Sequence, residues 1–342
     1  MQKFFLAAAL FSLLFNSCKT DFDITSDWED ISVIYGLLDP TDTAQYIKIN
    51  KAFLDKNTSA LVIAKIPDSL YYQNLNVQLQ QYLNGVFVKT IEMNQVDGNL
   101  EGFIKDTGIF ANQPNYLYKT KEILDQNSSY KLLLTQAEDG KEVSASTEII
   151  NDFAVVRPTT FTKVNFFPGG VYKTQWNSAK DGKIYALTIR FFYKEVSFAD
   201  TTLSQEKYLD WPIFSSLPSI STIGGQSMET DIDGDAFYTY VNSHLSEDPS
   251  VFRISEYFNF MFSVGGEEMD LYNQVTLAQQ GLTSGSAQPE YTNVENGLGL
   301  FSSRFHKTIF NVPIDVHTID SLACGQVTTH LRFINSVGDL CF

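Results

Sequence analysis

Short stretches of alternating hydrophobic and polar residues recur along the first half of the chain, and this alternation predicts β-strands. Residues 31–38 form an apolar stretch that ends at Asp39-Pro40, and residues 45–53 alternate between the two kinds of side chain. A strand turns successive side chains to opposite faces. The pattern therefore predicts strands with one buried side and one side in solvent.

Two turn signals predict β-hairpins in the same region. Asn84-Gly85 precedes an alternating stretch at residues 86–91, and Asp139-Gly140 separates residues 129–135 from residues 142–150. Dipeptides of this kind suit tight turns, because their residues tolerate a positive φ. Several short strands separated by turns are typical of a β-sandwich.

The second half of the chain also predicts strands. Residues 183–196 are apolar on both faces, which predicts a central strand covered on each side. Turns at Gly169-Gly170 and Asp181-Gly182 predict two more hairpins. Residues 297–310 and 327–334 are predicted to be the closing strands.

Two helices are predicted among these strands. Residues 234–245 place Phe237, Tyr238 and Val241 at helical spacing. Residues 267–280 begin with acidic side chains and are followed by a glycine. Acidic residues are favourable near a helix N-terminus, and glycine commonly follows the last turn.

The order of these elements predicts a mainly β fold class. The sequence shows no internal repeat and no alternation of strands with long helices. We expect a strand-rich, sandwich-like N-terminal domain, immunoglobulin-like or transthyretin-like, over residues 31–156. A second, mostly β domain with one or two short helices is expected over residues 157–342.

The N-terminal residues have the pattern of a secretory signal. Lys3 precedes an apolar run over residues 4–15, which is shorter than the ~20 residues that a spanning helix needs. Ser17-Cys18 then matches the end of a bacterial lipoprotein signal. We predict a signal peptide over residues 1–17 and lipidation of Cys18; an ordinary signal with a coincidental cysteine is the alternative.

Residues 18–30 form a short acidic tether after the predicted lipid site. An acidic stretch in this place resembles the export signal that sends some Bacteroidota lipoproteins to the outer face of the cell. A simple solvated linker is the alternative interpretation. The predicted location is therefore the outer membrane, on its periplasmic or its cell-surface face.

Composition and charge narrow the classes of function. Hydrophobic residues make up 44% of the chain, which is enough for sizeable cores. The net charge of −16 repels phosphates, so we predict no nucleic-acid partner. Besides Cys18, the chain has Cys324 and Cys341, which we predict to form a disulfide in an oxidising compartment; two free buried thiols are the alternative.

The sequence contains no recognisable catalytic or cofactor-binding set. Its 4 histidines form no metal-binding pair, and it has neither a G-x-S-x-G elbow nor a phosphate-binding glycine loop. Ser128 and Lys131, like Ser204 and Lys207, have the S-x-x-K spacing but lack the companion K-T-G triplet. We therefore predict no catalytic residue and no cofactor.

Three alternating carboxylates, Asp231, Asp233 and Asp235, form the best metal candidate. Such a pattern can hold a hard cation such as calcium. However, Gly234 and Asn242 do not match the glycine and glutamate positions of an EF-hand loop. The favoured interpretation is that Asp233 or Asp235 caps the helix that follows.

A segment near residue 300 carries a family resemblance. Asn293 precedes a turn with Gly297 and Gly299, and a strand begins through Phe301. This arrangement resembles a family of Bacteroidota outer-membrane lipoproteins of unassigned function. Many members of that family have a glycine at the position that Asn296 occupies here. The resemblance implies two β-rich domains and an accessory role at the cell envelope, because the family is often encoded beside TonB-dependent transporters.

Four Asp-Ser/Thr motifs also resemble the O-glycosylation sites of Bacteroidota. The predicted acceptor hydroxyls belong to Thr43, Ser69, Thr201 and Ser321.

These observations favour a lipid-anchored binding protein over an enzyme. The expected partner is an outer-membrane protein, for example a TonB-dependent transporter, and segments 217–233 and 281–293 are the predicted contact loops. Two alternatives remain: a surface hydrolase whose site is assembled in space, and a carbohydrate-binding module that uses Trp28, Trp176 or Trp211.

Overall fold

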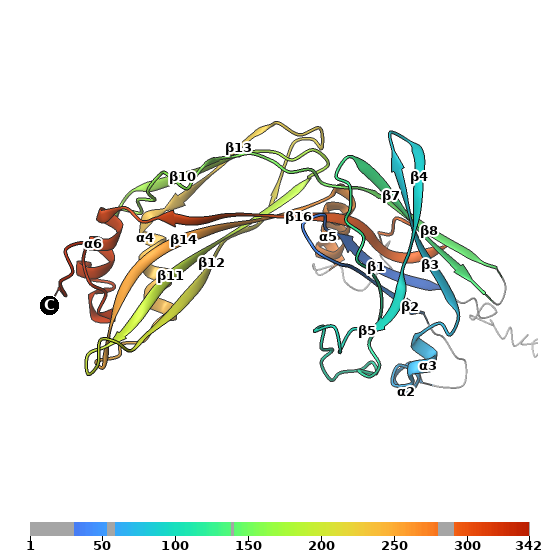
Figure 1. The fold of residues 1–342 in the computed structure, drawn as a ribbon, viewed down its shortest axis with the longest axis horizontal. Helices are drawn as coiled ribbons and strands as arrows, with labels where there is room; N and C mark the ends of the chain where they lie inside the picture. Colours follow the sequence, from blue (N-terminus) through green and yellow to red (C-terminus); the bar gives the residue numbers. More distant parts are fainter. Residues whose placement is uncertain (1–30, 53–58, 138–139, 280–290, 342) are drawn as a thin grey trace, which may run out of the picture.

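The computed structural model describes residues 31–52, 59–137, 140–279 and 291–341. Strands make up 48% of the model and helices 14%, which confirms the predicted mainly β fold class. Two lobes lie side by side along the long axis of the molecule, and strand β16 runs from one lobe into the other (Figure 1).

The largest sheet contains eight strands in the order β12-β11-β14-β16-β1-β2-β6-β5. Its paired strands are antiparallel except β1 and β16, which run parallel with Ser32 opposite Gly297 and Leu38 opposite Ser303. The eight strands are β1 (Ser32–Leu38), β2 (Gln45–Lys51), β5 (Asn94–Asp97), β6 (Tyr116–Thr120), β11 (Ile184–Ser197), β12 (Ser204–Pro218), β14 (Val251–Gly265) and β16 (Gly297–Pro313).

A five-stranded sheet, in the order β15-β8-β7-β3-β4, completes the N-terminal lobe. Its strands are β3 (Leu75–Leu83), β4 (Val86–Glu92), β7 (Ser128–Gln136), β8 (Glu142–Glu148) and β15 (Val294–Glu295). One hydrophobic core joins it to the larger sheet, with Ile34 and Ile47 on one side and Leu79 and Leu132 on the other. Val294 and Phe301, from the far end of the chain, belong to this core as well.

The predicted hairpins of the N-terminal lobe are confirmed. β3 pairs with β4 around Asn84 and Gly85, whose φ angles are 50° and 77°. β7 pairs with β8 in the second predicted hairpin. Local turn chemistry therefore determines the connections within the five-stranded sheet.

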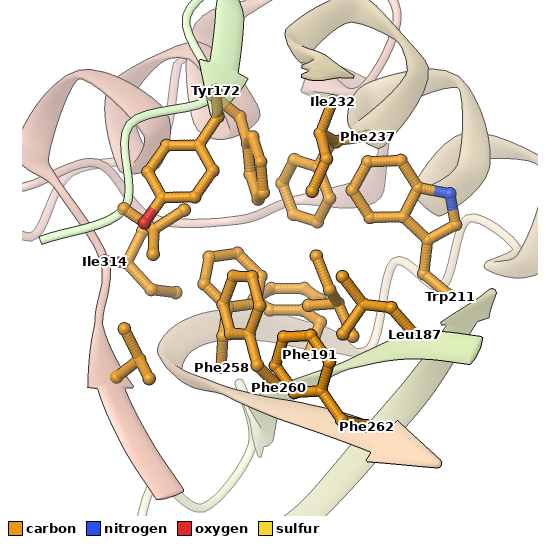
Figure 2. Packing of buried hydrophobic residues seen from close by; sticks show 14 of the residues in the cluster. Tyr172, Leu187, Phe191, Trp211, Ile232, Phe237, Phe258, Phe260, Phe262 and Ile314 are labelled. Carbon is orange, nitrogen blue, oxygen red and sulfur yellow. The ribbon is translucent and has the colours of Figure 1, made fainter. Parts of the chain in front are cut away.

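The C-terminal lobe has a second and larger core, rich in aromatic side chains (Figure 2). Phe258, Phe260 and Phe262 of β14 face Tyr172 and Phe237 across this core. Its outer layer consists of the three-stranded sheet β13-β10-β9 and helix α4. The bounds are β9 (Val155–Arg157), β10 (Val171–Asn177), β13 (Ser227–Asp233) and α4 (Gly234–His244).

Both predicted helices are present, and α6 (Val316–Cys324) is the longest of the helices that were not predicted. The helices at 234–245 and 267–280 correspond to α4 and to α5 (Glu267–Gln279), but residues 316–324 form an additional helix, α6. The remaining short helices are α2 (Ala60–Ile63), α3 (Pro67–Leu70) and a 3-10 turn, η1 (Thr329–Leu331). None of the helices in the described residues is long and apolar enough to cross a membrane.

Several strand predictions for the second half were wrong. Residues 327–334 form η1 and isolated bridges, because the last residues fold back over β14. The turn at Asp181-Gly182 connects two different sheets and closes no hairpin, since β10 pairs with β9 and β13. β11 is central in its sheet, but alternate side chains such as Arg190 remain half-exposed, so only one of its faces is fully covered.

The segment 217–233 is mostly not a loop. Its last seven residues form β13, which pairs with β10, and only residues 219–226 connect β12 to it. The other predicted contact segment, 281–293, lies outside the described residues except for its last three positions.

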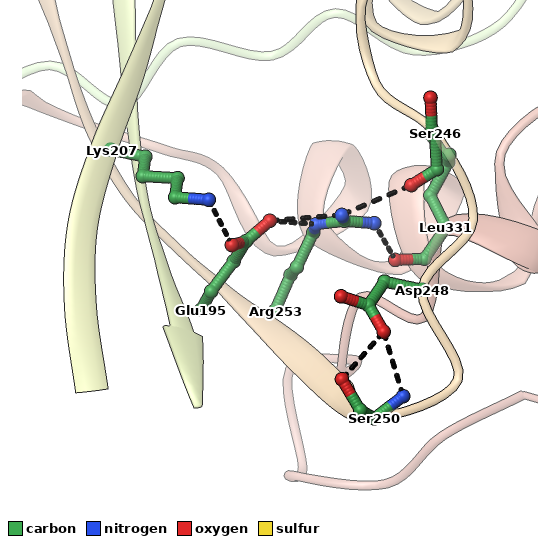
Figure 3. Close-up of polar contacts among 7 residues, drawn as sticks. All are labelled: Glu195, Lys207, Ser246, Asp248, Ser250, Arg253 and Leu331. Atoms are coloured by element: carbon green, nitrogen blue, oxygen red, sulfur yellow. Dashed lines mark hydrogen bonds and ion pairs between the residues drawn. The ribbon is translucent and has the colours of Figure 1, made fainter. Parts of the chain in front are cut away.

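A disulfide and a buried arginine stabilise the C-terminal segment. Cys324 in α6 and Cys341 form a disulfide with a Cα–Cα distance of 5.0 Å. The guanidinium of Arg253 on β14 donates to Glu195 of β11 at 2.9 Å and to the carbonyl of Leu331 at 2.7 Å (Figure 3). The predicted disulfide thus links the end of helix α6 to the last residues of the chain that the structure describes.

Candidate functional site

The outward face of the large sheet is hollowed where β1, β2 and β16 lie side by side. A cavity of about 500 Å³ lies there, and we call it the aromatic cavity. Its principal lining residues are Tyr35 of β1, Asp42 of the β1–β2 turn, Tyr46 of β2, Phe103 of the β5–β6 loop, and Leu300 and Arg304 of β16. Side chains that are far apart in sequence thus meet at one place, because β16 inserts beside β1.

Three aromatic rings surround the aromatic cavity. The rings of Tyr46 and Phe103 meet edge to face with centroids 4.7 Å apart. Tyr35 is partly exposed and packs edge-on against Tyr272 of α5, at 6.4 Å. A second cavity of about 310 Å³ lies on the other side of Tyr35, so this ring separates two neighbouring hollows.

A polar cluster closes one side of the aromatic cavity. Nη2 of Arg304 donates to Oδ2 of Asp42 at 2.9 Å, and its Nε lies 3.3 Å from Oδ2 of Asp39. Nδ1 of His306 lies 2.6 Å from the same Asp39 oxygen. Thr41 donates its backbone N–H and its hydroxyl to Oδ1 of Asp39.

Asp39 is ionised at the centre of this cluster although its side chain is fully buried. Burial alone would raise the pKa of Asp39, but the hydrogen bonds from His306 and Thr41 outweigh it, so the pKa lies below its ordinary value. Asp39 therefore holds Arg304 and His306 in fixed positions beside the cavity.

Asp39 and His306 together resemble the carboxylate–histidine half of a catalytic triad. Ser263 lies opposite His306 on β14, and both line a third cavity of about 260 Å³. Among the described residues, however, no serine, threonine or cysteine forms a hydrogen bond with the other ring nitrogen of His306. The nucleophile that a triad needs is therefore not in contact with its base.

A separate apolar patch covers one end of the N-terminal lobe. Helices α2 and α3 lie beside the β5–β6 loop, and the backbone N–H of Ala111 donates to the carbonyl of Ala64 at 2.8 Å (Figure 1). The exposed side chains that we call the apolar patch are Leu61, Val62, Ile66, Leu100, Ile104, Ile109 and Phe110. Large exposed apolar patches are uncommon on soluble monomers and mark interaction sites.

The three aspartates of the metal candidate make contacts within the protein. The side chain of Asp233 accepts from the backbone N–H of Asp235 and caps α4. Asp235 in turn accepts from the N–H of Gly169, and Asp231 lies 3.8 Å from Lys173. Across the described residues, no three or more His, Cys, Asp or Glu side chains are placed to hold a metal ion.

The other predicted sites are spread over the molecule. Cys18 lies outside the described residues. Thr43 and Thr201 are exposed in turns, whereas Ser69 on α3 and Ser321 on α6 are half-buried. Of the four predicted glycosylation acceptors, the two in turns are therefore the more accessible.

Within the described residues, the tryptophans form no sugar-binding platform. Trp176 and Trp211 are buried in the C-terminal core, where each packs against phenylalanine rings. Trp28 lies outside the described residues. Ser128 is buried and hydrogen-bonded to Gln81 and Asp125, and Lys207 pairs with Glu195, so neither S-x-x-K pair forms a site.

The remaining histidines have structural surroundings. His244 stacks on Tyr240 at 3.9 Å at the end of α4. His317 and His330 lie on α6 and η1. His306 is therefore the histidine that reaches a cavity together with other charged groups.

The glycine-rich segment behind the family resemblance is explained by packing. Asn293 makes two hydrogen bonds to the backbone of Phe301, at 2.6 and 3.0 Å. Gly299 has a φ of +113°, and a Cβ atom there would lie 1.9 Å from the carbonyl oxygen of Ile34. Asn296 has a φ of 59°, as expected for a residue in the place of a glycine.

A scan against protein-family models finds no match for this chain, and a search of curated proteins finds none either.

The aromatic cavity and the apolar patch were not predicted from the sequence. The apolar residues of segment 100–110, at positions 100, 103, 104, 109 and 110, were the available signal for the patch, since they fit neither a helical nor a strand period. The cavity had no local signal, because its walls combine the β1–β2 hairpin with the β5–β6 loop and β16, which are far apart in the sequence.

Proposed function

We propose that this protein is a lipid-anchored binding subunit of an outer-membrane assembly and that it catalyses no reaction. The proposed partner is an outer-membrane protein of the TonB-dependent transporter class. The lipid anchor would be at Cys18, and the protein would lie on the periplasmic or the cell-surface side of that membrane.

The apolar patch is the observation that supports this proposal. Leu100 and Ile104 are 88% and 80% exposed, so their side chains contribute almost nothing to the core. Burying them against a partner would gain roughly 25 cal/mol for each Å² of apolar surface removed from water. The net charge of −16 disfavours anionic surfaces, so a partner with a matching apolar surface is the better complement.

The anchor can be tested first. The variant Cys18→Ser should leave the membrane fraction and should not incorporate a fatty-acid label, because a thiol is required for lipidation. Washed membranes and the supernatant are compared by immunoblotting. Retention of the unlabelled variant in membranes stripped of peripheral proteins would contradict the anchor.

The patch is tested by affinity purification of the lipidated protein from native membranes, followed by mass spectrometry. Leu100→Glu combined with Ile104→Glu should lose the transporter that the unchanged protein brings down. Phe161→Glu combined with Val337→Glu is the matched control, because both side chains are equally exposed but lie on the other lobe. If the patch variant still recovers every specific partner, the docking surface is wrong.

A surface hydrolase remains the second candidate, favoured only by the Asp39–His306 pair. In that case the purified protein would hydrolyse a peptide or a glycan, and His306→Ala would abolish the turnover. Turnover without a recovered membrane partner would overturn the binding proposal.

A further inference from the structure

The aromatic cavity is a built site that the partner-binding proposal does not use. Its volume of about 500 Å³ lies within the ~300–1,000 Å³ range of small-molecule sites. Phe103 lies on its wall and packs edge to face against Tyr46, yet its side chain is 49% exposed. The cavity thus combines ring surface with access from solvent.

The rings supply a surface suited to C–H groups. The face of an aromatic ring carries partial negative charge, so it attracts the weakly positive C–H groups of a ligand. Tyr35 stands between the aromatic cavity and the hollow of about 310 Å³ beside Tyr272. A ligand longer than one ring could therefore pass over Tyr35 from one hollow to the next.

The polar groups of the cavity select against a charged ligand. Arg304 is already paired with Asp42 at 2.9 Å and lies 3.3 Å from Asp39, so two carboxylates surround one guanidinium. An anionic ligand would bring a third negative charge to this place. A cationic ligand would have to compete with Arg304 and His306 for the same two carboxylates.

A neutral ligand with several hydroxyl groups matches this arrangement. A hydroxyl group both donates and accepts, so neighbouring hydroxyls can donate to the carboxylate of Asp42 and accept from the guanidinium of Arg304. Because Asp39 holds Arg304 from the buried side, these groups are positioned before a ligand arrives. Such positioning lowers the entropy cost of binding.

We propose that the aromatic cavity binds a neutral sugar ring, whose C–H face lies on Tyr46, Phe103 and Tyr35 and whose hydroxyls reach Asp42 and Arg304. This site adjoins the apolar patch, because Phe103 and Ile104 lie on the same loop, but it does not require the proposed membrane partner. It also differs from a tryptophan platform, since the tryptophans of the described residues lie in the C-terminal core.

The test uses the purified full-length protein and a panel of glucose, galactose, mannose, N-acetylglucosamine, cellobiose and chitobiose, with glucuronate as the anionic counterpart of glucose. Binding is measured by saturation-transfer NMR and by titration calorimetry. We expect at least one neutral sugar to bind, with saturation on its ring C–H protons. Glucuronate should bind more weakly than glucose.

Variants then locate the site. Phe103→Ala and Asp42→Ala should each weaken binding by about tenfold, the loss expected for one aromatic or one hydrogen-bonding contact. Phe310→Ala should leave the affinity unchanged, because that ring is 59% exposed on β16 but lies outside the cavity lining. Circular dichroism confirms that each variant is folded.

Three results would overturn the proposal. They are no binding by any neutral sugar of the panel, equal affinity of Phe103→Ala and the unchanged protein, and tighter binding of glucuronate than of glucose. None of these results depends on whether a membrane partner is recovered, so the two proposals fail separately.

Discussion

At the scale of single residues, Asp39 and Asp42 show how burial changes the role of a carboxylate. Both contact the guanidinium of Arg304, but the side chain of Asp39 is fully buried and that of Asp42 is 45% exposed. An exposed ion pair contributes little to stability, whereas an unpaired buried group is costly. Asp39 is therefore expected to stabilise the folded protein, whereas Asp42 is expected to contribute to binding of the proposed ligand.

The substitution Asp39→Ala should lower the free energy of unfolding by about 3 kcal/mol, because Arg304, His306 and Thr41 lose a buried acceptor. The matched variant Asp42→Ala should cost less than about 1 kcal/mol. Urea unfolding followed by circular dichroism measures both. Equal losses for the two variants would contradict this role of burial.

The contribution of Asp39 should also depend on pH. Its pKa is held below the ordinary value in the folded protein, so its stabilisation is complete above the unfolded pKa of about 4. As the pH falls through the folded pKa, Asp39 becomes protonated and that stabilisation is lost. The difference in unfolding free energy between the unchanged protein and Asp39→Ala should therefore shrink in acid and stay constant near pH 7.

At the scale of elements, the pairing of β1 with β16 depends on a glycine at the point of closest approach. Gly299 combines a φ of +113° with a backbone contact that leaves no room for a side chain. The cost of a positive φ alone is roughly 1–2 kcal/mol for an alanine. A clash with backbone adds to that cost, because backbone cannot move aside as a flexible side chain can.

Gly299→Ala should therefore destabilise the protein by more than about 3 kcal/mol or prevent folding. Gly225→Ala is the control, since Gly225 has a φ of +78° but no atom within 4 Å of a Cβ position. Its loss should stay near 1 kcal/mol. Thermal unfolding of the two variants separates the clash from the conformational cost.

Arg253 anchors the C-terminal segment to the sheet in the same lobe (Figure 3). Its side chain is 4% exposed, so Arg253→Met would leave Glu195 without its buried partner. The expected loss is about 3–5 kcal/mol. Lys89→Met, which removes a pair with Glu122 in which both side chains are about half exposed, should cost less than about 1 kcal/mol.

The elements that could be predicted are those with local causes. The Asn84-Gly85 hairpin follows from residues that tolerate a positive φ, and α5 follows from its acidic first turn. Helix α6 was missed although Asp315 caps it and Ile319 and Leu322 share its buried side. The apolar positions of such a short helix form a weak pattern, and Asp315 was the stronger indication that a helix begins there.

The β1–β16 pairing and the aromatic cavity could not be predicted in this way. Both depend on Arg304 and Phe301 meeting strands that precede them by most of the chain length. Alternation of hydrophobic residues identifies a strand but does not identify its neighbour. The residues of the site were therefore visible in the sequence, while their proximity was not.

At the scale of the whole molecule, two hydrophobic cores share one long strand. The N-terminal core contains Phe301 of β16, together with Val294 of β15, and the C-terminal core contains Phe305 and Val312 of β16. The boundary predicted near residue 156 stays a prediction. The topology nevertheless shows that the first core is incomplete without residues from the end of the chain.

A fragment limited to residues 31–156 should therefore not fold, because β1 would lack its parallel neighbour and β8 would lack β15. Joining residues 291–306 to it through a flexible linker should restore a folded state. Dispersion of amide signals in NMR spectra distinguishes the two. A well-dispersed spectrum from the shorter fragment would show that the first core is self-sufficient.

The parallel pairing of β1 with β16 also determines when the first strand can fold during synthesis of the chain. Synthesis from the N-terminus delivers Ser32 early and Gly297 late, so β1 cannot pair with β16 until almost all of the chain has been made. Pairing between such distant segments slows folding and leaves strand edges open to other chains meanwhile. An incomplete chain that ends before Gly297 is therefore expected to associate with other chains more readily than the complete one.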